Sequence, residues 1–242
     1  MQLKLITIDF WDTLFSVNTD ALMNQHMSEF LITTLNNVGI AITEEDANDL
    51  TKRAWAYYKD KWQNEHRTPP VKEILNAIWT FPTNEKAFNY IVDYYENMIF
   101  LCPPDLEPDA HSSLIELSSK YKLAMVSDTG FSTGKIVNDL LTKLDIKKYF
   151  SAFSYSDETG VAKPHPRAFT TILEQLNIKA EESLHIGDIE RTDIKGAKSV
   201  GMRAIRYVSS VNKIAFEVQD DNTEADYIAH SWKEIVDYLM KD

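Results

Sequence analysis

The chain has 242 residues, of which 44% are hydrophobic and 26% charged, as in an ordinary soluble globular protein with room for a sizeable core. Its formal net charge of −12 argues against nucleic acid and against an anionic membrane surface, because both are bound by basic side chains. With a single cysteine, Cys102, and an N-terminal apolar run too short to be a spanning helix or signal peptide, we expect a cytoplasmic protein.

The first predicted element is the apolar run LKLITI at residues 3–8, which is short and rich in β-branched side chains. These features are typical of a buried strand. The run ends at Asp9, which opens the stretch DFWDTLF. In that stretch Asp12 follows Asp9 after three positions, and Trp11 lies between them. The end of this strand is the first candidate site.

A helical stretch follows, from about residue 19 to residue 101. Apolar residues recur at helical spacing up to Gly39, Thr43 and the acidic residues after it suit the start of a second helix, and Pro69–Pro70 suit the start of a third. A fourth helix is expected in residues 83–100. The helical spacing of the aromatic side chains favours a packed core over a stacking site for an aromatic substrate. These aromatic residues are Trp55, Tyr57, Tyr58, Trp62, Trp79, Tyr90, Tyr94 and Tyr95.

Strands and helices alternate in the rest of the chain. This alternation predicts a parallel sheet with crossover helices on both faces. The predicted strands lie at 122–128, 151–157, 183–188, 203–208 and 226–230, and the predicted helices at 132–144, 166–178, 192–201 and 231–240. We therefore expect an α/β fold with a Rossmann-like, doubly wound core made of residues 1–15 and 108–242. Residues 16–107 would be an all-helical insertion after the first strand.

Polar side chains follow four of the predicted strands. In open parallel sheets the carboxyl ends of the strands form the ligand-binding edge. Carboxylates without histidine or cysteine partners suit a hard cation such as Mg²⁺, and a lysine beside them suits a phosphoryl oxygen. The residues concerned are Asp9, Ser127, Asp128, Thr129, Lys163, Asp188 and Asp193.

Four motifs in sequence order resemble those of the haloacid dehalogenase (HAD)-like hydrolase superfamily, in the subgroup with a helical cap inserted after the first motif. Each motif alone would be a weak signal, but four in this order, each after a predicted strand, are a strong one. They are DFWDTLF at 9–15, MVSDTG at 125–130, AKPHPRAF at 162–169 and HIGDIERTDIKGAKSVG at 185–201. Residues 16–107 then correspond to the cap.

The resemblance implies a Mg²⁺-dependent hydrolase of a small phosphorylated molecule, either a phosphate ester or an acyl phosphate. Asp9 would attack phosphorus to form an aspartyl-phosphate, with Lys163 and Ser127 holding phosphoryl oxygens. The substrate contacts that it implies are Ser127, Asp128, Thr129 and Lys163, and the metal contacts are Asp9, Asp188, Asp193 and the backbone carbonyl of Trp11. We expect a monomer or a homodimer.

The first motif departs from the Asp-x-Asp-Gly-Thr-Leu pattern of the family's phosphatases. Aligning DFWDTL on Thr13 and Leu14 makes Asp9 the nucleophile, puts Trp11 in the place of the acid/base aspartate and Asp12 in the place of the glycine. An indole can act neither as a useful acid nor as a base here, which leaves three possibilities. Asp12 takes over the acid/base role; or the substrate has a leaving group that needs no acid, or an acid comes from the cap or the substrate; or the activity is weak. A metal-independent 2-haloacid dehalogenase and a non-catalytic protein that binds a phosphorylated ligand are the alternatives.

Overall fold

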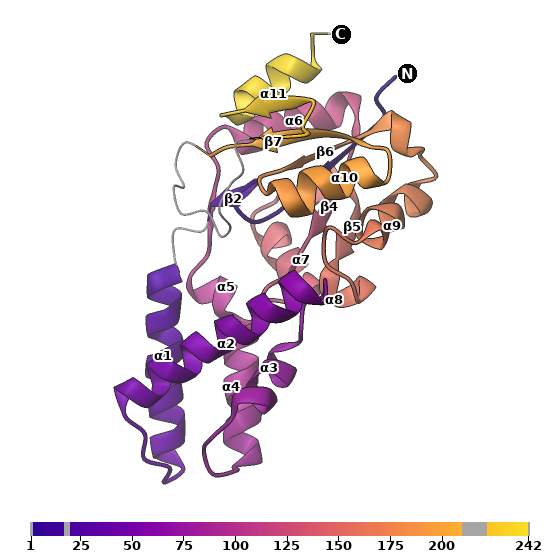
Figure 1. Ribbon diagram of the computed structural model, residues 1–242. Helices are drawn as coiled ribbons and strands as arrows, with labels where there is room; N and C mark the ends of the chain where they lie inside the picture. The colour runs from indigo at the N-terminus through magenta and orange to yellow at the C-terminus, as the bar shows by residue number, and fades with distance from the viewer. Residues whose placement is uncertain (1, 17–19, 210–221, 242) are drawn as a thin grey trace.

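A computed structural model describes residues 2–16, 20–209 and 222–241. In these ranges six parallel strands form one sheet in the order β5-β4-β1-β6-β7-β8 (Figure 1). The strands are β1 Leu5–Ile8, β4 Lys122–Ser127, β5 Phe150–Tyr155, β6 Ser183–Gly187, β7 Arg203–Tyr207 and β8 Tyr227–Ala229. The structure therefore confirms the predicted α/β fold. Among the helices described, none is long and apolar enough to cross a bilayer.

Strand β1 lies in the middle of the sheet, hydrogen-bonded to β4 on one side and to β6 on the other. All four of its residues are buried, which explains why it reads as a continuous apolar run. The strand order changes direction at β1, and such a switch point is where open α/β sheets leave a crevice at the carboxyl ends of their strands. The residues that follow β1, β4 and β6 are therefore neighbours.

Helices cover both faces of the sheet. On one face, helices α6, α7 and α11 share a hydrophobic cluster with Ile6 and Ile8, whereas Leu5, which points the other way, packs with α9 and α10. This is the doubly wound arrangement that the alternating sequence predicts. The bounds are α6 Ala110–Lys120, α7 Gly134–Lys143, α9 Pro166–Leu176, α10 Lys195–Ser199 and α11 Trp232–Leu239, with short turns α8 Ser156–Thr159, η1 Lys147–Tyr149, η2 Ala180–Glu182 and η3 Glu190–Ile194.

A second group of helices lies between β2 Phe15–Ser16 and β3 Asp105–Leu106, a short antiparallel pair. These helices extend away from the sheet in the lower part of Figure 1 and have a hydrophobic cluster of their own. They are α1 Asp20–Asn37, α2 Glu44–Asn64, α3 Val71–Ile78, α4 Glu85–Glu96 and α5 Met98–Leu101. Phe131 and Ala162, from the part of the chain that carries the sheet, also belong to this cluster. The division into two domains stays a prediction.

Local signals in the sequence account for several helix boundaries. Thr43 caps α2 as expected: its hydroxyl accepts a hydrogen bond from the backbone N–H of Asp46, whose carboxylate accepts one from the N–H of Thr43. Some helices differ from expectation: the helix predicted in residues 83–100 is divided into α4 and α5, and α8 replaces the end of the strand predicted at 151–157. Helix α6 was not predicted, and the helix expected at 192–201 spans only Lys195–Ser199, after a wider turn in which the N–H of Lys195 bonds to the carbonyl of Glu190.

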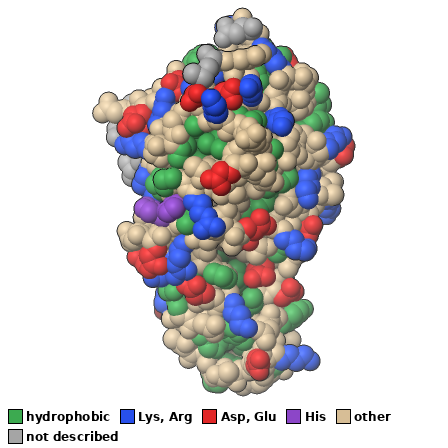
Figure 2. All heavy atoms as spheres, turned by 90° about the vertical axis from the view of Figure 1, so that its right-hand side faces the viewer, with side chains coloured by type: hydrophobic (Ala, Val, Ile, Leu, Met, Phe, Trp, Pro, Cys, Tyr) green, Lys and Arg blue, Asp and Glu red, His purple; other side chains and the backbone are tan. Residues whose placement is uncertain are grey.

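The surface drawn in Figure 2 intersperses acidic and basic side chains rather than gathering them by sign. Ion pairs one helical turn apart join some of the charges, such as Lys135 with Asp139 (2.8 Å) in α7 and Lys233 with Asp237 (2.9 Å) in α11. Such exposed pairs contribute only about 0–1 kcal/mol each to stability. The surface charges are therefore of little weight in holding the fold together, in contrast to the buried charges described next.

Candidate active site

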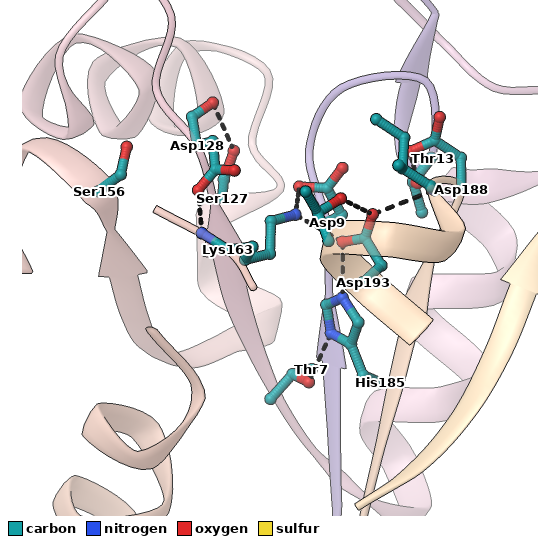
Figure 3. Close-up of polar contacts among 12 residues, drawn as sticks. Thr7, Asp9, Thr13, Ser127, Asp128, Ser156, Lys163, His185, Asp188 and Asp193 are labelled. Carbon is teal, nitrogen blue, oxygen red and sulfur yellow. Dashed lines mark hydrogen bonds and ion pairs between the residues drawn. The ribbon is translucent and has the colours of Figure 1, made fainter. Parts of the chain in front are cut away.

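Three carboxylates lie at the carboxyl ends of three adjacent strands, β4, β1 and β6 (Figure 3). Asp9 follows β1, Asp128 follows β4 and Asp188 follows β6, and the pairing of these strands brings the three residues to one edge of the sheet. Asp193, from the turn that precedes α10, joins them. The sequence-predicted acidic residues are thus gathered in one place.

Lys163 reaches this cluster from the loop before α9, and its side chain is almost fully buried. Its Nζ lies 2.6 Å from Oδ1 of Asp9 and 2.6 Å from Oδ1 of Asp193. The backbone N–H of the same residue donates to Oδ1 of Asp128 at 3.0 Å. Lys163 therefore links three of the carboxylates, and Figure 3 shows its side chain running between them.

His185 continues the chain of hydrogen bonds behind Asp193, and sequence reasoning missed it. This residue of β6 is fully buried, with Nε2 at 3.0 Å from Oδ1 of Asp193 and Nδ1 at 2.8 Å from the hydroxyl of Thr7. Burial lowers its pKa, so the ring is neutral: it donates from Nε2 to the carboxylate and accepts from Thr7 at Nδ1. The only signal in the sequence is a histidine inside an apolar strand.

Gly187, the last residue of β6, makes room for Asp193. A Cβ atom built on this glycine would lie only 2.4 Å from Cβ of Asp193, closer than any real contact. Oδ2 of Asp193 accepts hydrogen bonds from the hydroxyl of Thr192 (3.0 Å) and the backbone N–H of Ile189 (3.1 Å). Close packing against Gly187 and these bonds fix the orientation of the Asp193 carboxylate.

Negative charge exceeds positive charge in the cluster, and the pKa values reflect this. Burial raises the pKa of Asp9 to about 8, since the opposing effect of Lys163 is only partial and the charge of Asp193 adds to the increase. Burial and the charges of Asp193 and Asp9 also raise the pKa of Asp188. Burial acts the same way on Asp193, but Lys163 and His185 outweigh it and its pKa is lowered. The cluster would gain from a further cation.

The residues fit a divalent metal ion. Asp9, Asp188 and Asp193 each offer a carboxylate oxygen, and these atoms lie within 4.8 Å of one another. A set of hard oxygen donors with excess negative charge suits Mg²⁺. Thr13 contacts one of these carboxylates: its hydroxyl lies 3.5 Å from Oδ1 of Asp188.

Ser127 and Thr129 are buried beside the cluster and face protein groups. The hydroxyl of Ser127 lies 3.5 Å from the backbone oxygen of Asp128. Thr129 contacts Ser156, whose Oγ accepts from the backbone N–H of Thr129 at 3.0 Å and lies 2.6 Å from the hydroxyl of Thr68. Of the predicted stretch 127–129, Asp128 is the residue that lines the cavity described below.

The loop after Asp9 places Trp11 and Asp12 at the cavity as well. Asp12 has a positive φ of 53°, a left-handed conformation that favours glycine and that aspartate tolerates better than most residues. The backbone N–H of Asp12 donates to the carbonyl of Phe15 (2.7 Å), and that of Phe15 to Phe10 (2.9 Å). These bonds form a tight loop at the position where the family pattern has a glycine.

A cavity of about 400 Å³ adjoins the carboxylates. Asp9, Asp188 and Lys163 line one end of it, and side chains of α1, α2 and α5 line much of the rest. Trp62 of α2 also makes a direct link, because its indole N–H donates to Oδ2 of Asp128 at 2.7 Å. The cavity therefore lies between the sheet edge and the inserted helices.

Comparison with known proteins agrees with the geometry. The sequence matches the model of the haloacid dehalogenase-like hydrolases over residues 3–201. A glyceraldehyde 3-phosphate phosphatase from Methanocaldococcus jannaschii is 28% identical over 242 residues, covering 98% of this chain and 97% of the relative. A HAD phosphatase from Thermococcus onnurineus has a similar fold (TM-score 0.69, 20% identity, 98% of both chains). So does a 2-haloacid dehalogenase from Pseudomonas syringae (TM-score 0.70, 20% identity, 99% of both chains). The chain belongs to the haloacid dehalogenase-like hydrolase family.

Proposed function

We propose that this hydrolase is a phosphatase that cleaves a small phosphate ester or acyl phosphate, with Asp9 as the nucleophile. The observation that carries the proposal is the buried contact of Lys163 with both Asp9 and Asp193, at 2.6 Å each, beside a cavity of about 400 Å³. A buried lysine at this point neutralises phosphoryl oxygens and favours the ionised, nucleophilic form of Asp9. The name of the Methanocaldococcus relative supports the same reaction class.

In the proposed reaction a carboxylate oxygen of Asp9 attacks phosphorus, and the bond from phosphorus to the leaving oxygen breaks. Water then attacks the aspartyl-phosphate, which releases phosphate and restores Asp9. Lys163 holds phosphoryl oxygens throughout. Asp9, Asp188, Asp193 and the backbone carbonyl of Trp11 would hold Mg²⁺, which supplies charge neutralisation when bound.

We assign Ser127, Asp128 and Thr129, the remaining predicted residues, to the phosphoryl-binding part of the site, either through direct contact or by holding Lys163. Asp128 accepts from the backbone N–H of Lys163, so it holds that residue's backbone in place. Ser127 and Thr129, at and just after the end of β4, would each offer a side-chain hydroxyl, while the backbone N–H of Thr129 stays bonded to Oγ of Ser156. Residues 16–107 would act as a cap that closes the cavity, excludes water and selects the substrate.

Removal of divalent metal is expected to abolish hydrolysis, because three carboxylates and a dianionic phosphate would then repel one another with only Lys163 to offset the charge. The measurement is phosphate release from acetyl phosphate and from a panel of phosphate monoesters, with excess EDTA and after Mg²⁺ is restored. Activity that persists in EDTA would contradict the proposed metal site. Calcium, which prefers longer bonds and more ligands, is a control that should restore little activity.

Replacing Trp11 with aspartate is expected to raise kcat on alkyl phosphates by about 10–100-fold, since a positioned acid contributes about 10²–10⁴-fold to such reactions. Acyl phosphates, whose leaving group needs no protonation, should gain little. Trp11→Asn is the matched control, because it has the same size as aspartate without the titratable group. If Trp11→Asn gives the same increase, the gain comes from the space vacated by the indole and not from acid catalysis.

A metal-independent 2-haloacid dehalogenase is a second candidate, favoured by one observation. Trp11 lines the cavity at the position where the family's phosphatases have their acid/base aspartate, and displacement at carbon needs no such carboxylate. Chloride release from a 2-chloro acid in EDTA would decide for this reaction. A third candidate, a protein that binds a phosphorylated ligand without turnover, would show saturable binding of phosphate in Mg²⁺ and no hydrolysis.

A further inference from the structure

The cavity has a polar end and an apolar end. The carboxylates and Lys163 lie at the polar end, whereas the part formed with the inserted helices is lined mainly by aromatic and sulfur-containing side chains. Those side chains are Met23, Trp55, Tyr58, Trp62, Met98 and Phe131. Three of the aromatic residues that the helical spacing assigns to a core, Trp55, Tyr58 and Trp62, therefore also face the cavity.

Three polar groups at the apolar end are already bonded to protein, and one charged residue, Lys59, also lines the cavity. The indole N–H of Trp55 donates to Oδ1 of Asn24 at 2.9 Å, and the hydroxyl of Ser132 donates to the backbone carbonyl of Glu96 at 2.8 Å. The indole N–H of Trp62 is likewise engaged by Asp128. Hydroxyl groups of a sugar-like substrate would lose their water here and gain few partners, which costs free energy for each group.

The aromatic side chains form a preassembled wall. The rings of Trp55 and Phe131 are stacked, with centroids 4.3 Å apart and an interplanar angle of 27°, and Tyr58 meets Trp55 edge-on at 5.9 Å. Trp55 and Tyr58 come from α2 and Phe131 from the loop after β4, so the inserted helices and the part of the chain that carries the sheet form the wall together. A flat apolar group can add to such a cluster without reordering it.

Trp11, two positions after the proposed nucleophile, leads to the same chemistry. Trp11 lines the cavity where the family pattern has a proton donor, which favours a leaving group that departs as a stable anion. An aryl oxide and an aromatic carboxylate both do so, and both carry a flat, apolar ring. The wall and the missing acid therefore favour the same organic group.

We propose that the substrate is an aromatic phosphate, that is, an aryl phosphate or an aromatic acyl phosphate. The inference rests on the proposed function. Asp9 forms the bond to phosphorus, and the bond from phosphorus to the leaving oxygen breaks. The electron pair stays on the aryl oxide or carboxylate, so neither needs a proton to depart. Water completes the cycle and releases phosphate. The apolar wall holds the ring, and the polar end of the cavity holds the phosphoryl group.

The decisive experiment compares benzoyl phosphate with acetyl phosphate, which have the same reacting group and similar leaving groups. The expected result is a kcat/KM at least about tenfold higher for benzoyl phosphate, equivalent to about 1.4 kcal/mol. Equal values, or a preference for acetyl phosphate, would overturn the inference and leave the proposed phosphatase standing.

A binding measurement separates this inference from the proposed function. Phenylphosphonate and methylphosphonate differ, like benzoyl and acetyl phosphate, by an aromatic ring in place of a methyl group. Their carbon–phosphorus bond is not cleaved by this route, so they report binding alone. Calorimetry in Mg²⁺ should give a Kd at least about tenfold lower for phenylphosphonate. If that preference appears but neither acyl phosphate is hydrolysed, the ligand class is right and the proposed reaction is wrong. If the two phosphonates bind equally, the ligand class is wrong.

Variants of the wall test which residues provide the selectivity. Trp55→Ala should reduce the preference for benzoyl over acetyl phosphate by about fivefold or more. Phe131→Leu, a milder change in the ring stacked on Trp55, serves if Trp55→Ala does not fold. Trp79→Ala is the matched control, because Trp79 packs edge-on against Phe81 and Phe88 and does not line the cavity, so the preference should not change. A preference that survives both wall variants would contradict the assignment.

Discussion

Replacing Asp9 with asparagine is expected to abolish turnover, lowering kcat by about 10⁴-fold or more, as is usual when a nucleophile is removed. An amide of nearly the same shape keeps the packing of the site but cannot attack phosphorus. The measurement is phosphate release in Mg²⁺ on the best substrate of the panel. Retention of more than about 1% of the activity would remove Asp9 from the role of nucleophile.

The same variant has a second, opposite effect that serves as its control. Asp9 has a pKa of about 8 in the folded chain against 3.8 in the unfolded chain, so the folded state binds a proton more tightly. The favourable contribution of protonated Asp9 is complete below pH 3.8 and is lost as the pH rises towards 8. In EDTA at pH 8, Asp9→Asn should therefore unfold at higher denaturant concentration than the wild type, and the difference should shrink towards pH 4. A destabilised variant would instead mean that the activity loss reflects damage to the fold.

Replacing Lys163 with methionine is expected to cost both activity and stability. The variant leaves Asp9 and Asp193 buried without the cation that now lies 2.6 Å from each. Breaking a buried ion pair on one side usually costs about 3–5 kcal/mol, because a charge stays buried and uncompensated. We expect a loss of this size in urea unfolding in EDTA, and a fall in kcat of about 10³-fold or more where the fold survives.

Mg²⁺ should restore part of that stability, because a divalent cation offsets the same carboxylates. The matched control is Lys135→Met, which removes an exposed lysine paired with Asp139 at 2.8 Å and should change the unfolding free energy by less than about 1 kcal/mol. A Lys163→Met variant as stable as the Lys135→Met variant would show that the buried contacts contribute no net stability.

The fold was largely predictable from the sequence, because the alternation of short apolar runs with amphipathic helices is a local property. Helix α6 was missed for a physical reason. Its buried positions include Ser113 beside Leu114 and Leu117, so serine dilutes the apolar stripe by which a helix is recognised. The order of the strands was not predictable either, since the hydrogen bonds that place β1 between β4 and β6 connect distant parts of the chain.

The candidate site was predictable only where a motif places a charged residue at a strand end or in the loop that follows. Asp9 and Asp188 directly follow β1 and β6, Lys163 and Asp193 lie in later loops, and the structure brings all four together. His185 lies within a strand and is recognisable only once its contact with Asp193 is seen. The apolar wall was likewise not predictable from the sequence. Helical spacing shows that Trp55 packs inward, but it does not show that one edge of the packed cluster lines a cavity.

The central place of β1 has a consequence for how the protein acquires its activity. The proposed nucleophile, Asp9, directly follows β1, and the lysine that contacts it lies 154 residues further along the chain. Strand β1 cannot gain both of its neighbours until β6 has been synthesised, so an incomplete chain has an open strand edge and no assembled charge cluster. Contacts of such long sequence separation form late and slowly. The return of hydrolysis during refolding should therefore follow closure of the whole sheet, and not the faster formation of the helices.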